Sequence, residues 1–139
     1  MTRFVLDASV TLAWFLDHPT APYAERIKQL LLRGSRALVP ALWSLEIANG
    51  FMVAERRGIF TPNDAAEALR NLDMILAQAI EIGQDVVPVR RVLATAREFG
   101  LTAYDAAYLD AARVQQLPLA TLDRQLKDAA GRAGVSMLR

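Results

Sequence analysis

The sequence predicts an α/β protein in which a central parallel sheet of four or five strands lies between two layers of helices. Short apolar runs alternate along the chain with longer segments in which apolar residues recur at helical spacing. This alternation is typical of parallel strands whose connecting helices cover both faces of the sheet. We therefore expect a three-layer α/β/α fold.

Five short runs have the apolar or β-branched character of buried strands. The clearest are Phe4-Val5-Leu6 near the N-terminus and the run from Leu117 to Thr121. A brief Ile-Glu-Ile segment signals a strand only weakly. We expect strands over residues 3–7, 37–39, 80–82, 117–121 and 135–138.

Seven segments have helical periodicity, and residues typical of helix ends flank them. Pro22 and Pro62 suit the first turn of a helix. Glycine follows four of the segments, where it suits a helix C-terminus: Gly34, Gly58, Gly100 and Gly134. We expect helices over residues 9–15, 22–33, 41–57, 62–78, 89–99, 103–115 and 123–133.

Length and composition indicate a single domain over residues 1–139. The chain has 139 residues, 53% of them hydrophobic, which is enough for one core and too few for two ordinary domains. It has no cysteine, which excludes disulfides, thiolate zinc sites and cysteine nucleophiles. Because the sequence shows no secretion signal and no apolar run long enough to span a bilayer, we expect a cytoplasmic protein with no membrane partner.

Four acidic residues interrupt or border apolar runs: Asp7, Glu46, Asp105 and Asp123. Removing an ionised carboxylate from water is costly, so carboxylates in such places are normally paired or bound to a metal. Asp7 and Asp123 follow predicted strands, at the edge of a parallel sheet where ligand-binding groups gather. Glu46 lies within a helix, on a face that it shares with Asn49, which indicates a polar cleft wall.

Each acidic residue also has an ordinary structural explanation. Asp7 can end a strand, and Asp123 can cap the helix that follows it. Thr102 and Asp105 can form a capping box, in which the carboxylate bonds back to the start of the helix. A single glutamate in a helix, such as Glu46, is usually solvated. The four together favour a site, because they lie at one edge of the predicted sheet or on helices at that edge.

Four carboxylates in one cleft cannot all be ionised without a cation. Oxygen ligands without His or Cys select Mg²⁺ or Mn²⁺ over Zn²⁺. Ser9 and Thr121 could orient metal-bound water or a phosphate oxygen, or could serve as helix-cap and strand-end hydroxyls. The single histidine, His18, excludes a multi-histidine zinc hydrolase and the two-imidazole chemistry of a metal-free ribonuclease. Phosphodiester hydrolysis is the chemistry best suited to such a site.

The charge distribution is compatible with a polyanionic substrate. The chain has 16 basic and 15 acidic residues, so neutralising the four clustered acids leaves a surplus of basic charge on the remaining surface.

Four segments together resemble the PIN-domain ribonucleases and, among them, the VapC-type toxins of bacterial and archaeal toxin-antitoxin pairs. In chain order they are Val5-Leu6-Asp7-Ala8-Ser9, Ser44-Leu45-Glu46-Ile47-Ala48-Asn49, Leu101-Thr102-Ala103-Tyr104-Asp105-Ala106-Ala107-Tyr108-Leu109 and Leu119-Ala120-Thr121-Leu122-Asp123. The resemblance covers essentially the whole chain.

This resemblance implies that the four acidic residues are the catalytic quartet, with Asp7 and Asp105 the most direct metal ligands. It implies that Asn49 and Thr121 are supporting polar groups. It also implies a homodimer, an RNA substrate and a cognate antitoxin whose C-terminal segment lies across the active-site groove.

We therefore predict a Mg²⁺-dependent endoribonuclease toxin for which Mn²⁺ can substitute. Asp7, Asp105 and Asp123 are expected to hold one or two ions, with Glu46 acting partly through water. One alternative is a phosphatase with Asp7 as nucleophile, which is disfavoured because Ser9 stands where such sites want a second acid. The other is an inactive PIN-fold module that binds an antitoxin or RNA.

The high apolar content further suggests that aromatic side chains are exposed for a partner to cover. We expect these to include Trp14, Trp43 or Phe51.

Overall fold

The computed structural model describes residues 2–84 and 86–139. Within them, one parallel sheet has the strand order β3-β2-β1-β4. The strands are β1 (Arg3–Leu6), β2 (Arg36–Val39), β3 (Ile80–Ile82) and β4 (Leu119–Ala120). Val5 of the central strand β1 lies opposite Leu38 on one side and Leu119 on the other. The predicted parallel α/β architecture is confirmed.

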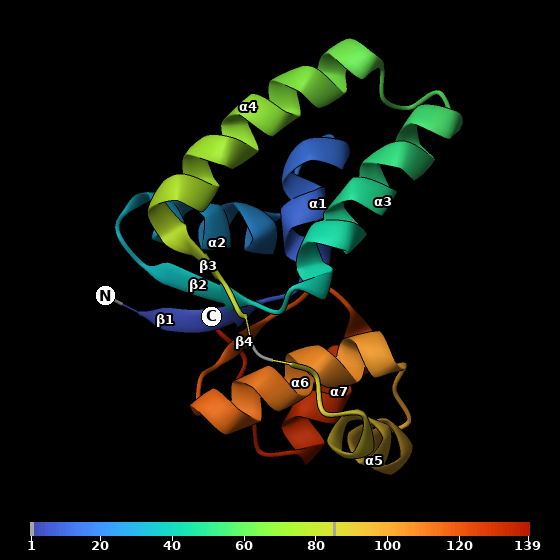
Figure 1. The fold of residues 1–139 in the computed structure, drawn as a ribbon. Helices are drawn as coiled ribbons and strands as arrows, with labels where there is room; N and C mark the ends of the chain where they lie inside the picture. The colour runs from blue at the N-terminus through green and yellow to red at the C-terminus, as the bar shows by residue number, and fades with distance from the viewer. Residues whose placement is uncertain (1, 85) are drawn as a thin grey trace.

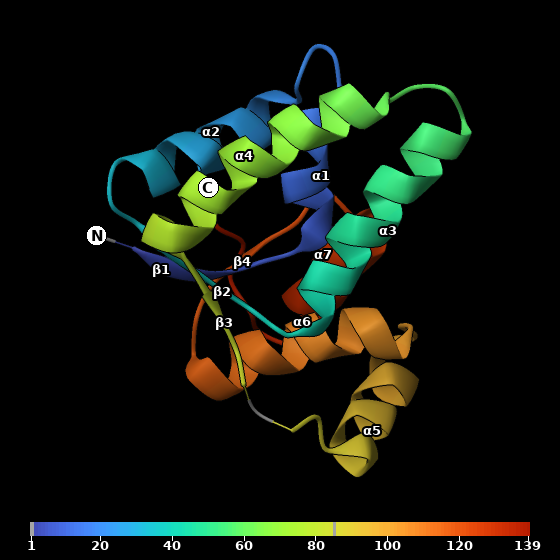
Figure 2. The ribbon, with the colours of Figure 1, turned by 45° about the horizontal axis from the view of Figure 1, so that its top comes forward.

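Helices cover both faces of the sheet, as Figure 1 shows. One layer holds α1 (Ala8–Leu16), α2 (Pro22–Leu32), α3 (Leu42–Arg56) and α4 (Pro62–Ala79), and the other holds α5 (Val89–Phe99), α6 (Ala103–Gln115) and α7 (Arg124–Arg132). In Figures 1 and 2, α3 and α4 project away from the sheet and converge on the turn that joins them. The helix bounds agree closely with those predicted from periodicity and helix-end residues. None of the helices described is long and apolar enough to span a membrane.

The sheet of the described residues has four strands, and the fifth strand that the sequence allowed beside β4 does not form. The segment 135–138 is not a fifth strand, because it pairs with β4 through one isolated bridge, between Leu119 and Met137. Two backbone hydrogen bonds fasten it there, from Leu119 N to Ser136 O and from Leu138 N to Leu119 O, each 2.9 Å long. A partner strand of only two residues, β4, offers no room for a longer ladder.

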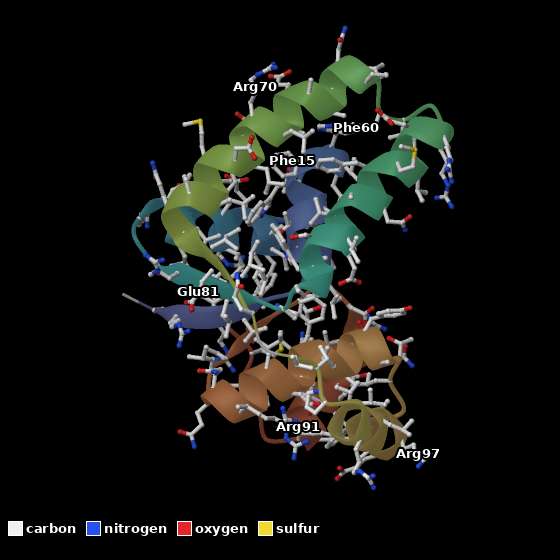
Figure 3. The ribbon with its side chains drawn as sticks, viewed as in Figure 1. Phe15, Phe60, Arg70, Glu81, Arg91 and Arg97 are labelled. Atoms are coloured by element: carbon white, nitrogen blue, oxygen red, sulfur yellow. The ribbon has the colours of Figure 1, made fainter. Side chains whose placement is uncertain are left out.

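The large aromatic side chains lie in the core. Trp14, Trp43 and Phe51 are 7%, 1% and 6% exposed. Phe51 packs against Phe15 and Phe60, with ring centroids 5.8 and 5.2 Å away, and Figure 3 shows the two partners among α1, α3 and α4. The prediction of exposed aromatic surface at these three residues is therefore wrong. Instead, they fill the space within the layer formed by α1 to α4.

A glycine allows α3 to lie close to α1. A Cβ atom on Gly50 would stand 2.5 Å from Cδ2 of Leu12, closer than two carbon atoms can pack without movement. Glu46 lies one helical turn before Gly50 on α3, and α1 begins directly after Asp7. The close approach of the two helices therefore brings the Glu46 end of α3 towards the end of β1.

Candidate active site

Asp7 is held by two hydroxyl groups at the carboxyl end of β1. Its side chain is buried, and its Oδ2 atom accepts hydrogen bonds from Ser9 Oγ at 2.6 Å and from Thr121 Oγ1 at 2.7 Å. Although Asp7 occupies the N-cap position of α1, its side chain makes no capping hydrogen bond. Asp7 does stand at the end of a strand, as the ordinary structural explanation requires. That role does not require a buried carboxylate, so the burial of the Asp7 side chain needs another reason.

The same hydroxyls fasten the segment that follows β4. Ser9 Oγ accepts the backbone N–H of Leu122 at 3.0 Å, and Thr121 Oγ1 accepts that of Asp123 at 3.0 Å. Asp123 Oδ1 then accepts the N–H of Leu126 at 3.0 Å and caps α7. The capping explanation is thus correct for one of the two Asp123 oxygens. Both hydroxyls orient protein groups at the joined ends of β1 and β4.

Asp105 lies in the first turn of α6, where Thr102 is the N-cap. The Thr102 hydroxyl accepts the backbone N–H of Asp105 at 3.1 Å. At the start of α4, by contrast, Thr61 and Asp64 make both bonds of a capping box. In the described part of the chain the Asp105 carboxylate makes no such return bond, so the capping-box explanation holds only for the threonine. The carboxylate is left available for another role.

Glu46 is half-buried on α3 and is bonded to a residue of α6. Its Oε1 atom accepts a hydrogen bond of 2.6 Å from the hydroxyl of Tyr108. The sequence reasoning missed Tyr108 as a site residue, although it lies one helical turn after Asp105 on the same helix. Asn49 is exposed, and within residues 2–84 and 86–139 it joins no hydrogen bond of this network.

Burial and repulsion by neighbouring carboxylates raise the pKa values of Asp7, Glu46 and Asp105. Burial, together with charge repulsion from Asp123, Asp7 and Glu46, raises the pKa of Asp105 to about 6. Burial also raises the pKa of Asp7 against the hydroxyls that lower it, with Asp123 adding repulsion. The pKa of Glu46 is raised by burial and by Asp7, against the hydrogen bond from Tyr108. Asp7 and Asp123 are joined through Thr121, and Glu46 is bonded to Tyr108 on the helix that carries Asp105. We call these four neighbouring acidic residues the acidic cluster.

The donors of the acidic cluster fit a hard divalent cation. Asp7, Glu46 and Asp123 each have one oxygen fixed by the bonds given above, and their second oxygens receive no side-chain hydrogen bond from the described residues. As they stand, no three Asp, Glu or His side chains of the described chain converge tightly enough to enclose one ion. Mg²⁺ commonly binds one or two carboxylates and completes its shell with water or substrate oxygens, so it requires no closed protein cage.

The raised pKa values predict how the metal-free protein responds to pH. An acid whose pKa rises on folding keeps its proton longer in the folded state, so stability is lost as pH rises from the unfolded pKa to the folded one. For Asp105 this window runs from 3.8 to about 6. Urea unfolding of metal-free protein should show stability falling through this window, with a shallower fall in Asp105→Asn. A wild-type stability that rises throughout the window would contradict the clustering of these acids.

The cap of α6 is open to a separate test. Thr102→Ala should lower the free energy of unfolding by about 1 kcal/mol, because it removes the acceptor for the Asp105 N–H. Thr102→Ser keeps the hydroxyl and should lose much less. Chemical denaturation followed by circular dichroism measures both variants. An equal loss in the two would mean that the hydroxyl is not what stabilises the helix start.

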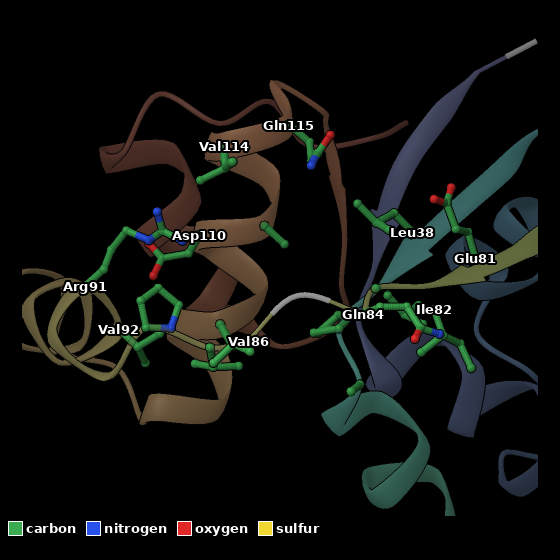
Figure 4. A pocket seen from close by; sticks show the side chains of 18 of the residues that line it. Leu38, Glu81, Ile82, Gln84, Val86, Arg91, Val92, Asp110, Val114 and Gln115 are labelled. Atoms are coloured by element: carbon green, nitrogen blue, oxygen red, sulfur yellow. The ribbon is translucent and has the colours of Figure 1, made fainter.

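A separate groove of about 350 Å³ opens near β3 and α6. Figure 4 shows its wall, including Leu38, Ile82, Val92 and Val114. No member of the acidic cluster lines it. The groove is therefore a different surface from the candidate active site.

The chain belongs to the PIN-domain family, because the family model for the PIN domain matches residues 4–132. Among curated proteins it is similar to Ribonuclease VapC3 of Pyrobaculum aerophilum, with 29% identity over 126 residues that cover 91% of this chain and 93% of the relative. The resemblance to VapC-type members of the family is confirmed.

Solved structures agree with this assignment of the fold. PAE2754 from Pyrobaculum aerophilum aligns with a TM-score of 0.70 and 25% identity, covering 92% of this chain and 84% of the other. A toxin-antitoxin complex from Klebsiella pneumoniae contains a chain that aligns with a TM-score of 0.61 and 19% identity, covering 96% of both chains. At that identity the second likeness is evidence for the fold alone.

Proposed function

We propose that this chain, as a single PIN domain, is a Mg²⁺-dependent endoribonuclease and the toxin of a toxin-antitoxin pair. The observation that carries the proposal is the acidic cluster of Asp7, Glu46, Asp105 and Asp123 at one edge of the sheet, where burial and neighbouring carboxylates raise the pKa values of Asp7, Glu46 and Asp105. Membership of the PIN-domain family and the similarity to Ribonuclease VapC3 support a nuclease. Mn²⁺ is expected to substitute for Mg²⁺.

In this proposal Asp7, Asp105 and Asp123 hold one or two ions, with no more than two of these carboxylates on the same ion as the side chains now stand, and Glu46 acts partly through water. A divalent ion supplies polarisation of the phosphate and a water of lowered pKa. Ser9 and Thr121 would keep Asp7 in a fixed orientation, since both donate to the same oxygen. This preorganisation limits the reordering of Asp7 during the reaction.

Basic residues near the acidic cluster support RNA as the substrate. Arg124 and Lys127 are exposed in the first turns of α7, directly after Asp123. Arg97 is exposed on α5, and Figure 3 labels it. Within the described chain, none of these three side chains lies within ion-pair distance of an acid. They are therefore available to neutralise phosphates beside the cluster.

An exposed apolar stripe on α3 supports an antitoxin partner. Leu45 is 75% exposed beside Glu46, and Met52, two turns further along, is 43% exposed. An amphipathic helix could cover this surface and direct a basic side chain towards the acids. The name of the Klebsiella pneumoniae complex is consistent with such a partner. Co-expression with a small protein encoded beside this chain should restore the growth of cells that produce it.

The groove of Figure 4 supports a homodimer. Val86, Val87 and Val114 line it and are exposed, which leaves an apolar surface that a second copy would cover. Sedimentation velocity of the isolated protein over a range of concentrations should show a dimer.

A cleavage assay separates the proposed function from its alternatives. Purified protein is incubated with structured RNA and with a small phosphate monoester, in EDTA and in Mg²⁺ or Mn²⁺. The ribonuclease cuts internal RNA bonds only with metal. A phosphatase with Asp7 as nucleophile would release phosphate from the monoester, and an inactive module would do neither.

A further inference from the structure

Tyr108 is the one buried tyrosine whose hydroxyl bonds a member of the acidic cluster within the described chain. Its side chain is 0% exposed, and its hydroxyl donates to Glu46 Oε1 at 2.6 Å across 62 residues of sequence. Burial and this hydrogen bond raise the pKa of Tyr108 far above its usual value, so the phenol keeps its proton and remains a donor. The backbone N–H of Ala8 has the opposite effect on this pKa, which places the hydroxyl beside the first residue of α1.

The hydroxyl of Tyr108 thus lies where three elements meet. α6 supplies the phenol, α3 supplies Glu46, and α1 begins at Ala8, the residue after Asp7. Asp105 lies one turn earlier on the same helix as Tyr108. The hydrogen bond therefore ties Glu46 of α3 to the helix that also carries Asp105.

Glu46 needs such an anchor more than the aspartates do. Its side chain has more rotatable bonds, it is only half-buried, and the charges of Asp7 and Asp105 repel it. Without the hydrogen bond, repulsion would favour rotamers that carry the carboxylate out into water. With Oε1 held, Oε2 is left near the other acids.

We propose that Tyr108 is a positioning residue, whose hydroxyl holds Glu46 in the acidic cluster so that its carboxylate is ordered before a divalent ion binds. This inference rests on the proposed metal-dependent function. Tyr108 itself contacts neither metal nor substrate in this account and acts through Glu46.

The experiment measures Mn²⁺ binding without RNA, by the electron paramagnetic resonance signal of free Mn²⁺. Wild type, Tyr108→Phe, Glu46→Gln and the double variant are compared. Tyr108→Phe should weaken Mn²⁺ binding about tenfold, as expected for loss of a hydrogen bond to a charged group. The double variant should bind no more weakly than Glu46→Gln, because the phenol then has no carboxylate to hold.

Tyr23→Phe is the matched control. Its hydroxyl donates a hydrogen bond of the same 2.6 Å length, to the backbone oxygen of Leu138, away from the acidic cluster. This variant should lose stability while keeping wild-type Mn²⁺ affinity. If Tyr108→Phe does not fold, Glu46→Asp replaces it. This substitution shortens the side chain by one methylene group, which draws the carboxylate away from the Tyr108 hydroxyl, and it should likewise weaken Mn²⁺ binding.

The outcomes separate this inference from the proposed function. Unchanged affinity in Tyr108→Phe, or an added loss when it is combined with Glu46→Gln, overturns the positioning role and leaves the metal site standing. If wild type binds no Mn²⁺, the proposed metal-dependent function fails, and the positioning role fails with it.

Discussion

Asp7→Asn is expected to abolish RNA cleavage while leaving the fold intact. The amide is close in shape to the carboxylate, and its oxygen can still accept the hydroxyls of Ser9 and Thr121. What is lost is the negative charge that the metal requires. Because a metal ion contributes several kcal/mol to the transition state, the cleavage rate should fall by about a thousandfold or more. Asp105→Asn should have a similar effect.

Asp128→Asn is the control for this substitution. It makes the same chemical change, with the same change in net charge, on an exposed residue of α7. It should cleave RNA at the wild-type rate. Circular dichroism should be unchanged in all three variants. Substantial cleavage by Asp7→Asn would rule out its carboxylate as a metal ligand.

The second large effect concerns stability. Mutual repulsion strains the acidic cluster in the metal-free protein, and an ion that binds only the folded state relieves it. At a hundred times its dissociation constant, Mn²⁺ should raise the free energy of unfolding by about 2.7 kcal/mol. Asp7→Asn removes one repelling charge, so it should be at least as stable as wild type in EDTA and gain less from Mn²⁺.

Thermal melts at neutral pH, in EDTA and in saturating Mn²⁺, measure both effects. Asp128→Asn again serves as the control and should gain as much as wild type. An equal gain in Asp7→Asn would place the stabilising ion elsewhere on the chain.

Much of the fold could be predicted because periodicity and helix-end residues report local structure directly. Parallel strands also placed Asp7 and Thr121 at one edge, although 114 residues separate them, and the structure joins them by a hydrogen bond. The acidic residues stood out because a charge beside an apolar run requires a partner.

The remaining features depend on contacts between distant segments. Tyr108 sits in an apolar helix and looks like an ordinary core residue until Glu46, on another helix, is brought to its hydroxyl. Residues 135–138 have strand-like character, but whether they extend the sheet depends on the length of β4. Trp43 and Phe51 could be assigned to the core only once the packing of α1 against α3 was known.

The most direct test of the central claim is the rate of RNA cleavage by wild-type protein as Mn²⁺ is titrated into a metal-free sample. The proposed acidic-cluster metal site predicts no cleavage in EDTA and a saturable rise with Mn²⁺, half-complete at the concentration that half-saturates the thermal stabilisation. Full cleavage in EDTA would contradict it.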